Sequence, residues 1–440
     1  MSLHAKGWIP WLAAVMAVHG VLLVLYHLPE AKPGLGDERM YLRAASAVAA
    51  EGSSGLGSFW PPAYAWFLAP LVVLGRGSVW LVQAAQTALL VGAAWLLREL
   101  VWRALEDRWA ANLTALLVVG YPPLVAFAHY LWPEVLHLAL MLAALVVLVR
   151  WGPGLAAAVA GGALLALCLQ TKLLLLPMLP LLGTGLWWLW PPRRRLPALL
   201  ALAVTCALGI LPTLVAQQRD FGRLMLANSA RFDLWLSLNE VSRHEFRDSA
   251  VVAEYPRYVQ SARSIDRREE IVYDKIVQTL GERGLWSSLR RQLGIQYFRL
   301  FGRDSFLTVQ LEGGAVWQRG DGYRAGNSTA AQVIRWLSYA MWAAILVMVA
   351  WGVAVFPYRG RRSGWWVLGF LLIQCGLFLV LHVKTRYRIQ MLPGLFFFAA
   401  YGAGWWRARR SGTDQPRASR RQWVSGLTLC TLLLYLAFGG

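Results

Sequence analysis

Two adjacent acids, Asp37 and Glu38, follow the first apolar stretch of the chain and precede a Trp60-Pro61-Pro62 turn. Carboxylates are costly within membrane proteins and often mark functional sites there. One of them could act as a general base that removes a proton from a hydroxyl group. The pair could equally cap the helix whose apolar residues recur from Met40 onward. The two roles are compatible, because a helix N-terminus holds a carboxylate rigidly.

A second group of polar residues, His129, Tyr130 and Glu134, surrounds the start of a later apolar stretch. Glu134 directly follows Trp132-Pro133, and a proline and an acid in the first turn are ordinary stabilisers of a helix. A carboxylate, an imidazole and a phenol at one membrane boundary could also form the wall of a binding site. Both interpretations predict a helix that begins close to Glu134.

Four basic residues complete the set. Lys172 lies between two apolar runs, where it could snorkel to the surface or bind an anionic headgroup. Lys384, Arg386 and Arg388 form a cluster, and the planar fork of arginine suits phosphate oxygens. Together these acids and bases suit the transfer of a group from a lipid phosphate to a hydroxyl. A carboxylate would take the hydroxyl proton, and the cations would neutralise the departing phosphate.

These residues must be positioned by membrane helices. The chain has 440 residues, 58% of them hydrophobic, and a mean hydropathy of +0.46, which is typical of a polytopic membrane protein. Apolar stretches of about 17 to 25 residues recur, the length that crosses a hydrocarbon core of roughly 30 Å. We therefore predict an all-α protein with about eleven transmembrane helices. The predicted helices cover residues 8–28, 78–97, 109–127, 132–149, 154–171, 173–190, 197–216, 336–356, 364–382, 389–406 and 423–439.

The distribution of charge orients these helices. The formal net charge is +20, and the cytoplasmic loops of membrane proteins carry an excess of Lys and Arg. With the N-terminus in the cytoplasm, the arginine clusters that fall on the inner side lie at 98–108, 193–195, 359–362 and 407–421. Asp37 and Glu38 then lie outside, as do the basic residues at 384–388. Topology and anionic lipid headgroups account for the basic pI, so no nucleic-acid partner is expected.

The same arrangement divides the chain into segments. The first segment, 1–28, has no convincing small-residue cleavage site and is predicted to remain as a membrane anchor. An external loop at 29–77 carries the acidic pair, and its short apolar stretch 61–74 is predicted to lie on the outer surface. A longer external insertion at 217–335 is large enough for a mainly helical subdomain over the site. The remaining segments are two groups of transmembrane helices at 78–216 and 336–406, a cytoplasmic linker at 407–422 and the last helix at 423–440.

The sequence does not require a cofactor. Asp37, Glu38 and Glu134 could hold a divalent cation such as Mg²⁺ or Mn²⁺, but no spacing of ligands demands one. The four cysteines all fall within apolar stretches, where cysteine behaves as a small hydrophobic residue. They form neither a zinc pattern nor a disulfide framework. A divalent cation and no cofactor at all are both compatible with this chain.

Several short motifs resemble one family. Gly36-Asp37-Glu38-Arg39-Met40-Tyr41, with Trp60-Pro61-Pro62-Ala63-Tyr64, resembles the first external loop of the GT-C membrane glycosyltransferases. The branch that it resembles includes the protein O-mannosyltransferases and the aminoarabinose transferases that act on lipid A. Three later motifs resemble elements of the same branch, and they are Leu131-Trp132-Pro133-Glu134, Gln170-Thr171-Lys172-Leu173 and Arg386-Tyr387-Arg388. The resemblance covers about residues 8–400 in order and spacing.

The resemblance implies an inverting transfer of a sugar from a polyprenyl-phosphate-linked donor to a hydroxyl of a glycan, lipid or protein. It implies that Asp37 and Glu38 are the catalytic carboxylates, with Asp37 as the general base. The residues that it implies for substrate binding are Tyr41, Tyr64, His129, Glu134, Lys172, Lys384, Arg386, Tyr387 and Arg388. Trp60 stands where aminoarabinose transferases typically carry Lys. The sequence therefore fits a bacterial inner-membrane enzyme that acts on a cell-envelope glycan or glycolipid better than an aminoarabinose transferase of lipid A. The site of this enzyme would face the periplasm.

Two other functions fit parts of the pattern. An O-antigen-type polymerase shares the many helices and the large external loop, but its essential arginines would lie in the insertion, at Arg257, Arg263 and Arg267. A transporter of lipid-linked sugars would place polar residues near the middle of the bilayer and break its helices there. In this chain the polar groups gather at one surface instead, which favours surface chemistry over transport.

Overall fold

The computed structural model describes residues 13, 15–20, 37–52, 59–239, 243, 265–303, 315–318, 322–325, 328–412 and 418–439. Over these residues the chain is helical, apart from one antiparallel hairpin of β1 (Ala315–Gln318) and β2 (Gly322–Ala325). Ala315 pairs with Ala325 in this hairpin. The predicted all-α class therefore describes the fold, with the hairpin as a small addition inside the insertion.

Four helices of the described chain are long and apolar enough to cross a membrane. They are α4 (Trp80–Leu105), α10 (Pro192–Phe221), α15 (Thr329–Val355) and α16 (Ser363–Val380). The pair α5 (Arg108–Gly120) and α6 (Pro122–His129) passes the same test jointly, with a bend of 50° between its members. These helices indicate a multi-pass membrane protein. The larger total of about eleven helices stays a prediction, and most of the first one, 8–28, lies outside the described residues.

Proline explains one departure from the predicted helices. The stretch 173–190 is not one helix, because it divides into the 3₁₀ helix η1 (Leu173–Met178) and α9 (Leu179–Leu189). Pro177 lies inside η1 and Pro180 in the first turn of α9, and a proline withholds the N–H that a continuous helix would need. Lys172, just before the division, has an extended backbone with φ −153° and ψ 131°.

The segment predicted to form the first external loop contains two helices, α2 (Asp37–Glu51) and α3 (Ala63–Leu74). They share a small core that includes Tyr41, Ala45, Tyr64 and Leu68. The short apolar helix expected at 61–74 is therefore present as α3, and its location on the outer membrane surface stays a prediction. The acidic pair forms the first turn of α2.

The central bundle contains α7 (Glu134–Arg150), α8 (Leu155–Thr171), the 3₁₀ helix η3 (Thr385–Gln390) and α17 (Leu392–Arg410). The last helix is α18 (Arg420–Phe438). Where α15 crosses α17, Gly352 and Gly402 face each other so closely that a Cβ on either would collide with the other backbone. Small residues permit such an approach of two membrane helices. This crossing anchors α17 and the η3 segment that precedes it.

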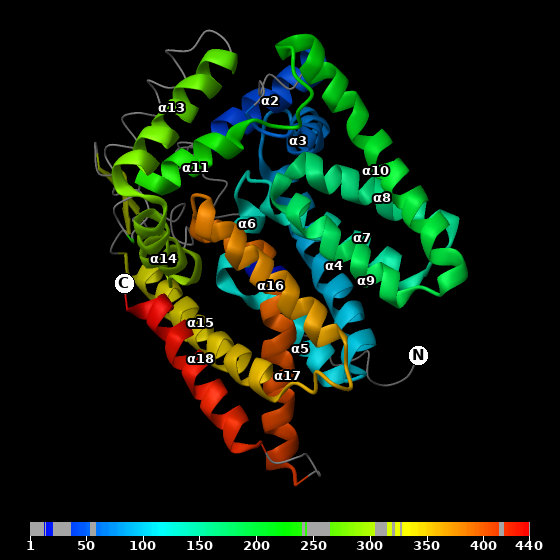
Figure 1. Ribbon diagram of the computed structural model, residues 1–440, viewed down its shortest axis with the longest axis vertical. Coiled ribbons are helices and arrows are strands. Elements are labelled where there is room, and N and C mark those ends of the chain that lie inside the picture. The colour runs from blue at the N-terminus through cyan, green and yellow to red at the C-terminus, as the bar shows by residue number, and fades with distance from the viewer. Residues whose placement is uncertain are drawn as a thin grey trace.

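The insertion predicted at 217–335 contains α11 (Ser229–Asn239), α13 (Ile265–Arg283), α14 (Leu285–Phe301) and the hairpin. At its two ends, α10 continues to Phe221 and α15 begins at Thr329. Phe232, Trp235 and Val272 belong to a separate small core between α11 and α13. Figure 1 shows α11 and α13 at the same end of the molecule as α2 and α3. Phe232 of α11 lies 5.8 Å between ring centres from Phe59, so the insertion contacts the segment between α2 and α3.

Candidate functional site

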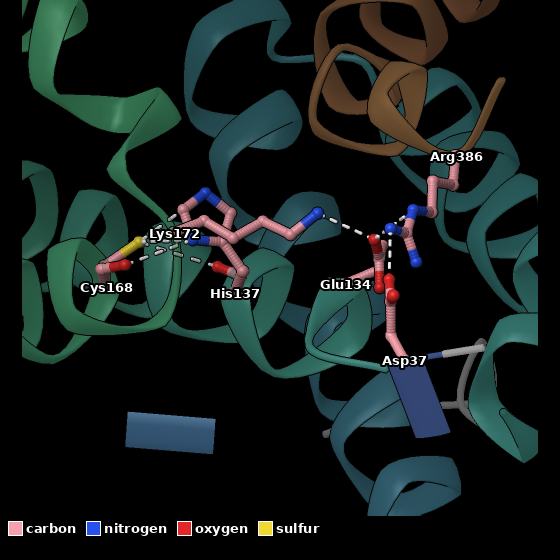
Figure 2. A network of polar contacts seen from close by, with 6 residues as sticks. All are labelled: Asp37, Glu134, His137, Cys168, Lys172 and Arg386. Atoms are coloured by element: carbon pink, nitrogen blue, oxygen red, sulfur yellow. Dashed lines mark hydrogen bonds and ion pairs between the residues drawn. The ribbon is translucent and has the colours of Figure 1, made fainter. Parts of the chain in front are cut away.

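Four charged side chains from four distant segments meet at one place (Figure 2). Arg386 Nη2 donates a hydrogen bond of 2.6 Å to Asp37 Oδ2, and Lys172 Nζ donates one of 2.7 Å to Glu134 Oε1. Arg386 Nε also lies 3.6 Å from Glu134 Oε1. The charges therefore alternate in the order Asp37, Arg386, Glu134 and Lys172, and we call these four residues the ionic cluster.

Backbone geometry explains why these side chains converge. Asp37 and Glu134 are the first residues of α2 and α7, where the positive end of the helix dipole stabilises a carboxylate. Lys172 follows the last residue of α8 directly and precedes η1. Arg386 lies in η3, which begins after the extended residue Lys384. The acids thus lie at helix starts, whereas Lys172 lies just before one 3₁₀ helix and Arg386 lies within another.

A second contact fixes the pairing of α7 with α8 one turn away from the cluster. His137 Nδ1 lies 3.2 Å from the carbonyl oxygen of Cys168 and 3.4 Å from its Sγ, as Figure 2 shows. His137 is three residues after Glu134, and Cys168 is four residues before Lys172, so each lies one helical turn from its cluster residue. This contact helps to hold Lys172 opposite Glu134.

Exposure distinguishes the members of the cluster. Only 1% of the Glu134 side chain and 9% of the Arg386 side chain are exposed, against 25% for Asp37. Asp37 is therefore the member that a second substrate can reach. Burial by itself raises the pKa of Asp37, but the positive charges of Arg386, Lys384 and Lys172 outweigh burial and hold the pKa below its usual value. Asp37 is ionised at neutral pH, as a general base must be.

Aromatic rings frame the two cations of the cluster. The Arg386 guanidinium lies 4.6 Å from the ring centre of Trp132, and Lys172 Nζ lies 5.0 Å from that of Tyr387. Tyr387 in turn stacks on Phe378, with 5.9 Å between ring centres. Such cation–π contacts orient a cation without neutralising it. Tyr387, a predicted binding residue, is thus adjacent to the cluster, and Trp132 is a neighbour that the sequence did not single out.

Glu38 points away from the cluster, although it follows Asp37 in the sequence. Its side chain is buried, and Glu38 Oε1 accepts a hydrogen bond of 3.0 Å from the Leu131 N–H. Successive residues of an α-helix are about 100° apart around its axis, so the side chains of Asp37 and Glu38 leave α2 in different directions. The bond ties α2 to the turn that precedes Glu134. We infer that Glu38 positions Asp37 relative to Glu134.

This positioning role predicts a loss of stability. Glu38→Ala leaves the buried N–H of Leu131 without this acceptor, which should cost about 1–3 kcal/mol of unfolding free energy. Glu38→Gln keeps an acceptor oxygen and should retain most of the stability and the activity. Thermal unfolding in detergent would measure the change, with the exposed Glu51→Ala on the same helix as a control. A Glu38→Gln protein that is stable but as inactive as an Asp37 variant would instead make Glu38 catalytic.

The tyrosines Tyr41 and Tyr64 support the acids from inside the protein. Both are buried, and their rings meet edge to face at 4.9 Å. Tyr64 Oη donates a hydrogen bond of 2.9 Å to Gln86 Oε1, and Gln86 Nε2 donates to the carbonyls of Ala128 and Tyr130 at 3.1 and 2.7 Å. The pair thereby connects α2 and α3 to the chain just before Glu134.

His129 and Arg388 make their contacts elsewhere. His129 is buried, and its Nε2 lies 2.9 Å from Nδ1 of His19. Arg388 donates to the carbonyl of Gly302, lies 3.3 Å from Tyr121 Oη, and stacks over Trp342 at 4.5 Å. These contacts assign Arg388 to the packing of the bundle. The roles of both as binding residues stay predictions.

Of the three arginines expected to be essential in a polymerase, the structure describes only Arg267. Arg267 is exposed on α13 and pairs with Glu270 at 2.8 Å, which is an ordinary surface ion pair. Arg257 and Arg263 lie outside the described residues. The polymerase alternative therefore stays a prediction.

Asp233 of α11 is a further acid near the cluster that the sequence did not single out. Its carbonyl oxygen accepts a hydrogen bond of 3.2 Å from the His382 N–H, close before Lys384 and Arg386. Burial raises the pKa of its carboxyl group, while His382 and Lys384 act against this rise. An acid within the apolar run Phe232-Asp233-Leu234-Trp235 was the available signal.

Among the described residues, no group of three or more His, Cys, Asp or Glu side chains could hold a metal ion. The three predicted ligands are engaged differently: Asp37 with Arg386, Glu134 with Lys172, and Glu38 with the Leu131 N–H. Cations of the protein itself therefore neutralise Asp37 and Glu134.

An apolar cavity of about 870 Å³ lies between α4, α7, α9, α16 and α17. One end lies near Leu175 and Pro393, which closely follow Lys172 and η3 in the chain. Arg103, Arg361 and Arg362 line the cavity where α4 ends and α16 begins. The cavity is large enough to hold part of a long apolar chain.

No known protein family and no curated protein matches this chain in sequence. Two crystal structures of ArnT from Cupriavidus metallidurans are similar to it in fold. The apo structure covers 99% of this chain and 78% of its own, with 17% identity and a TM-score of 0.39. The structure bound to undecaprenyl phosphate covers 97% of this chain and 77% of its own, with 16% identity and a TM-score of 0.38. The match to ArnT thus extends over nearly the whole chain, at a modest TM-score.

Proposed function

We propose that this protein is an inverting glycosyltransferase that moves a sugar from a polyprenyl-phosphate-linked donor to a hydroxyl acceptor. The acceptor is a cell-envelope glycan, a lipid or a protein, and the site faces the periplasm of a bacterial inner membrane. The observation that carries this proposal is the ionic cluster, in which a reachable carboxylate, Asp37, lies within 2.6 Å of a buried guanidinium. Base and phosphate-binding group are thus adjacent.

The chemistry needs both partners. Asp37 takes the proton of the acceptor hydroxyl while the hydroxyl oxygen attacks the anomeric carbon of the donor sugar. The bond between that carbon and the phosphate oxygen breaks on the opposite face, and its electron pair stays on the phosphate. Arg386, Lys172 and Lys384 neutralise the charge that develops there. The anomeric configuration inverts, because attack and departure occur on opposite faces.

The ion pair between Asp37 and Arg386 gives the steps an order. While Arg386 holds Asp37, the carboxylate is a weak base with a depressed pKa. A donor phosphate that binds Arg386 competes with Asp37 for the same guanidinium. Donor binding therefore raises the basicity of Asp37 just before the acceptor hydroxyl needs it. The donor is expected to bind first.

The lipid part of the donor needs an apolar environment next to the cluster. The cavity between α4, α7, α9, α16 and α17 begins near Leu175 and Pro393 and is lined mainly by apolar side chains. We assign it to the polyprenyl chain. The phosphate would then lie at Lys172 and Arg386, and the chain would extend into the bundle.

A transfer assay in nanodiscs tests the function. Wild-type protein is given radiolabelled polyprenyl-phosphate-linked sugars, and label is followed into an acceptor or into water. Label should move from these donors and not from nucleotide-linked sugars, and a parallel sample with chelator decides whether a metal is needed. If no polyprenyl-phosphate donor is consumed, the polymerase and transporter functions take precedence, and pyrophosphate-linked oligosaccharides become the next substrates to try.

Donor binding should weaken at alkaline pH. Burial lowers the pKa of Lys172, and its pairing with Glu134 offsets this only in part. The phosphodiester of the donor keeps its charge over this range, so affinity should fall as pH rises through the lowered pKa of Lys172 and the cation is lost. In Lys172→Arg the cation persists, and the loss should move to higher pH. Donor affinity measured between pH 7 and pH 10 checks this, and identical profiles for both proteins would contradict it.

A further inference from the structure

We propose that the apolar cavity binds an anionic phospholipid at the end where Arg103, Arg361 and Arg362 line it, which we call the arginine end. The headgroup phosphate lies against the guanidinium groups, and one acyl chain enters the cavity between α9 and α16. This second lipid site lies apart from the ionic cluster, and the inference does not depend on the proposed function.

The arginine end and the ionic cluster lie at opposite ends of α16. Arg362 is the N-cap of this helix, whereas Lys384 and Arg386 follow its last residue, Val380. The helix has 18 residues, and at 1.5 Å per residue it is about 27 Å long, close to the roughly 30 Å of a hydrocarbon core. Because α16 is apolar enough to cross a membrane, the arginine end lies at the membrane surface opposite the cluster.

Tryptophans mark the same level of the bundle. Trp188 lies at the end of α9 and Trp365 near the start of α16, and they are 65% and 58% exposed. The two helix ends are in contact, because a Cβ on Gly185 would lie 3.6 Å from the ring of Trp366. Tryptophan is enriched where a membrane meets water. The arginine end is therefore at the level of the phospholipid headgroups.

Two of the three arginines keep an uncompensated charge. Arg361 Nη1 donates to the carbonyls of Ala104 and Leu105 at 3.2 and 2.5 Å, which fixes the guanidinium at the end of α4 without cancelling its charge. No hydrogen bond or ion pair among the described residues engages the side chain of Arg362, which is exposed. One guanidinium is thus held in place, and the next one along the chain is available to a ligand.

One acid also lines the arginine end. It is Glu106, the exposed C-cap residue of α4. Arg103 is paired with Glu99 at 2.8 Å, so Arg361 and Arg362 remain as two cations against the single carboxylate of Glu106. The net charge of the arginine end is positive, which an anionic headgroup complements. Basic pockets between membrane helices are a recurrent site of such headgroups.

The rest of the lining determines what kind of anion fits. Next to the arginines the cavity is lined by apolar side chains, which include Leu97, Leu182, Leu186, Val367 and Phe370. A free phosphate satisfies the arginines alone, whereas a phospholipid also places an acyl chain against this lining. The topology of the chain accounts for arginines at one membrane surface, but it does not require them to line a cavity.

Binding of defined lipids to the full-length protein in detergent tests this inference. Delipidated protein is titrated with phosphatidylglycerol, with phosphatidylcholine of the same acyl chains and with glycerol 3-phosphate, and bound ligands are counted by native mass spectrometry. Phosphatidylglycerol should have the lowest Kd. Arg362→Gln should raise that Kd about fivefold, the effect of one basic side chain near a membrane surface. Arg359→Gln, an exposed arginine outside the cavity lining, should bind like wild type.

A second variant carries the opposite expectation and serves should Arg362→Gln not fold. Glu106→Gln removes the acid of the arginine end and should lower the Kd for phosphatidylglycerol, whereas a loss of packing would raise it. An unchanged or raised Kd in Glu106→Gln overturns the inference. Equal Kd values for phosphatidylglycerol and phosphatidylcholine also overturn it, as does equal binding by Arg362→Gln and Arg359→Gln. Glycerol 3-phosphate that binds as tightly as phosphatidylglycerol would identify a site for a soluble anion instead.

Discussion

Replacing Asp37 with asparagine is expected to lower kcat for sugar transfer by about 10²- to 10⁴-fold, which is the usual contribution of a general base. The amide keeps the size of the side chain but cannot take the acceptor proton. Donor affinity should not fall and should rise, because Arg386 loses the anion that competes with the donor phosphate. A fall in kcat with a fall in KM is the signature of this double role.

Steady-state transfer and separate donor titrations would measure these effects. Glu51→Gln removes an exposed acid from the other end of the same helix and should behave like wild type. Full activity in Asp37→Asn would exclude Asp37 as the base. Lost donor binding would show instead that the ion pair with Arg386 is needed to build the site.

Arg386→Met is expected to be the most destabilising substitution of the site, at about 3–5 kcal/mol, because it removes a buried cation that lies between Asp37 and the buried Glu134. Asp37 would lose its hydrogen-bonded partner, and Glu134 would retain only Lys172. Donor binding should be lost as well. Arg386→Lys restores the charge without the planar fork, so it should recover stability only in part.

Thermal unfolding of the purified variants provides the measurement. The exposed Arg359→Met serves as a control for the loss of one arginine. The double variant Asp37→Asn with Arg386→Met should be less destabilised than the sum of the two single variants, since neither leaves the other charge unpaired. Strict additivity would mean that the two side chains do not interact in solution.

The acids at 37 and 38 show what the sequence can and cannot predict. Residue type and the apolar pattern predicted a helix there with the acids at its start, and α2 begins at Asp37. Adjacency in the sequence suggested one catalytic pair. Adjacent residues on a helix diverge by about 100°, and the Leu131 N–H that Glu38 meets lies 93 residues away. No local pattern contains that partner.

The pairing of Lys172 with Glu134 illustrates the same limit. Each residue was recognised as a candidate, because a charge in an apolar run is unusual. Their 2.7 Å contact depends on the packing of α7 against α8 and on the proline-rich break after Lys172. Asp233 was missed for a related reason: His382, whose N–H meets the Asp233 carbonyl, comes from another part of the chain, and only the tertiary fold brings the two together.

The alternating charges of the ionic cluster have a consequence for competition among lipids. Phospholipids of the surrounding bilayer also carry a phosphate, and they far outnumber any lipid-linked sugar. In this site the two cations Arg386 and Lys172 already have carboxylate partners, at 2.6 and 2.7 Å. A phospholipid that displaced Asp37 would leave that carboxylate without a partner, whereas a donor brings sugar hydroxyls that can bind it. The site would then discriminate against bulk phospholipids because their binding leaves the Asp37 carboxylate unpaired, a cost that only the donor avoids.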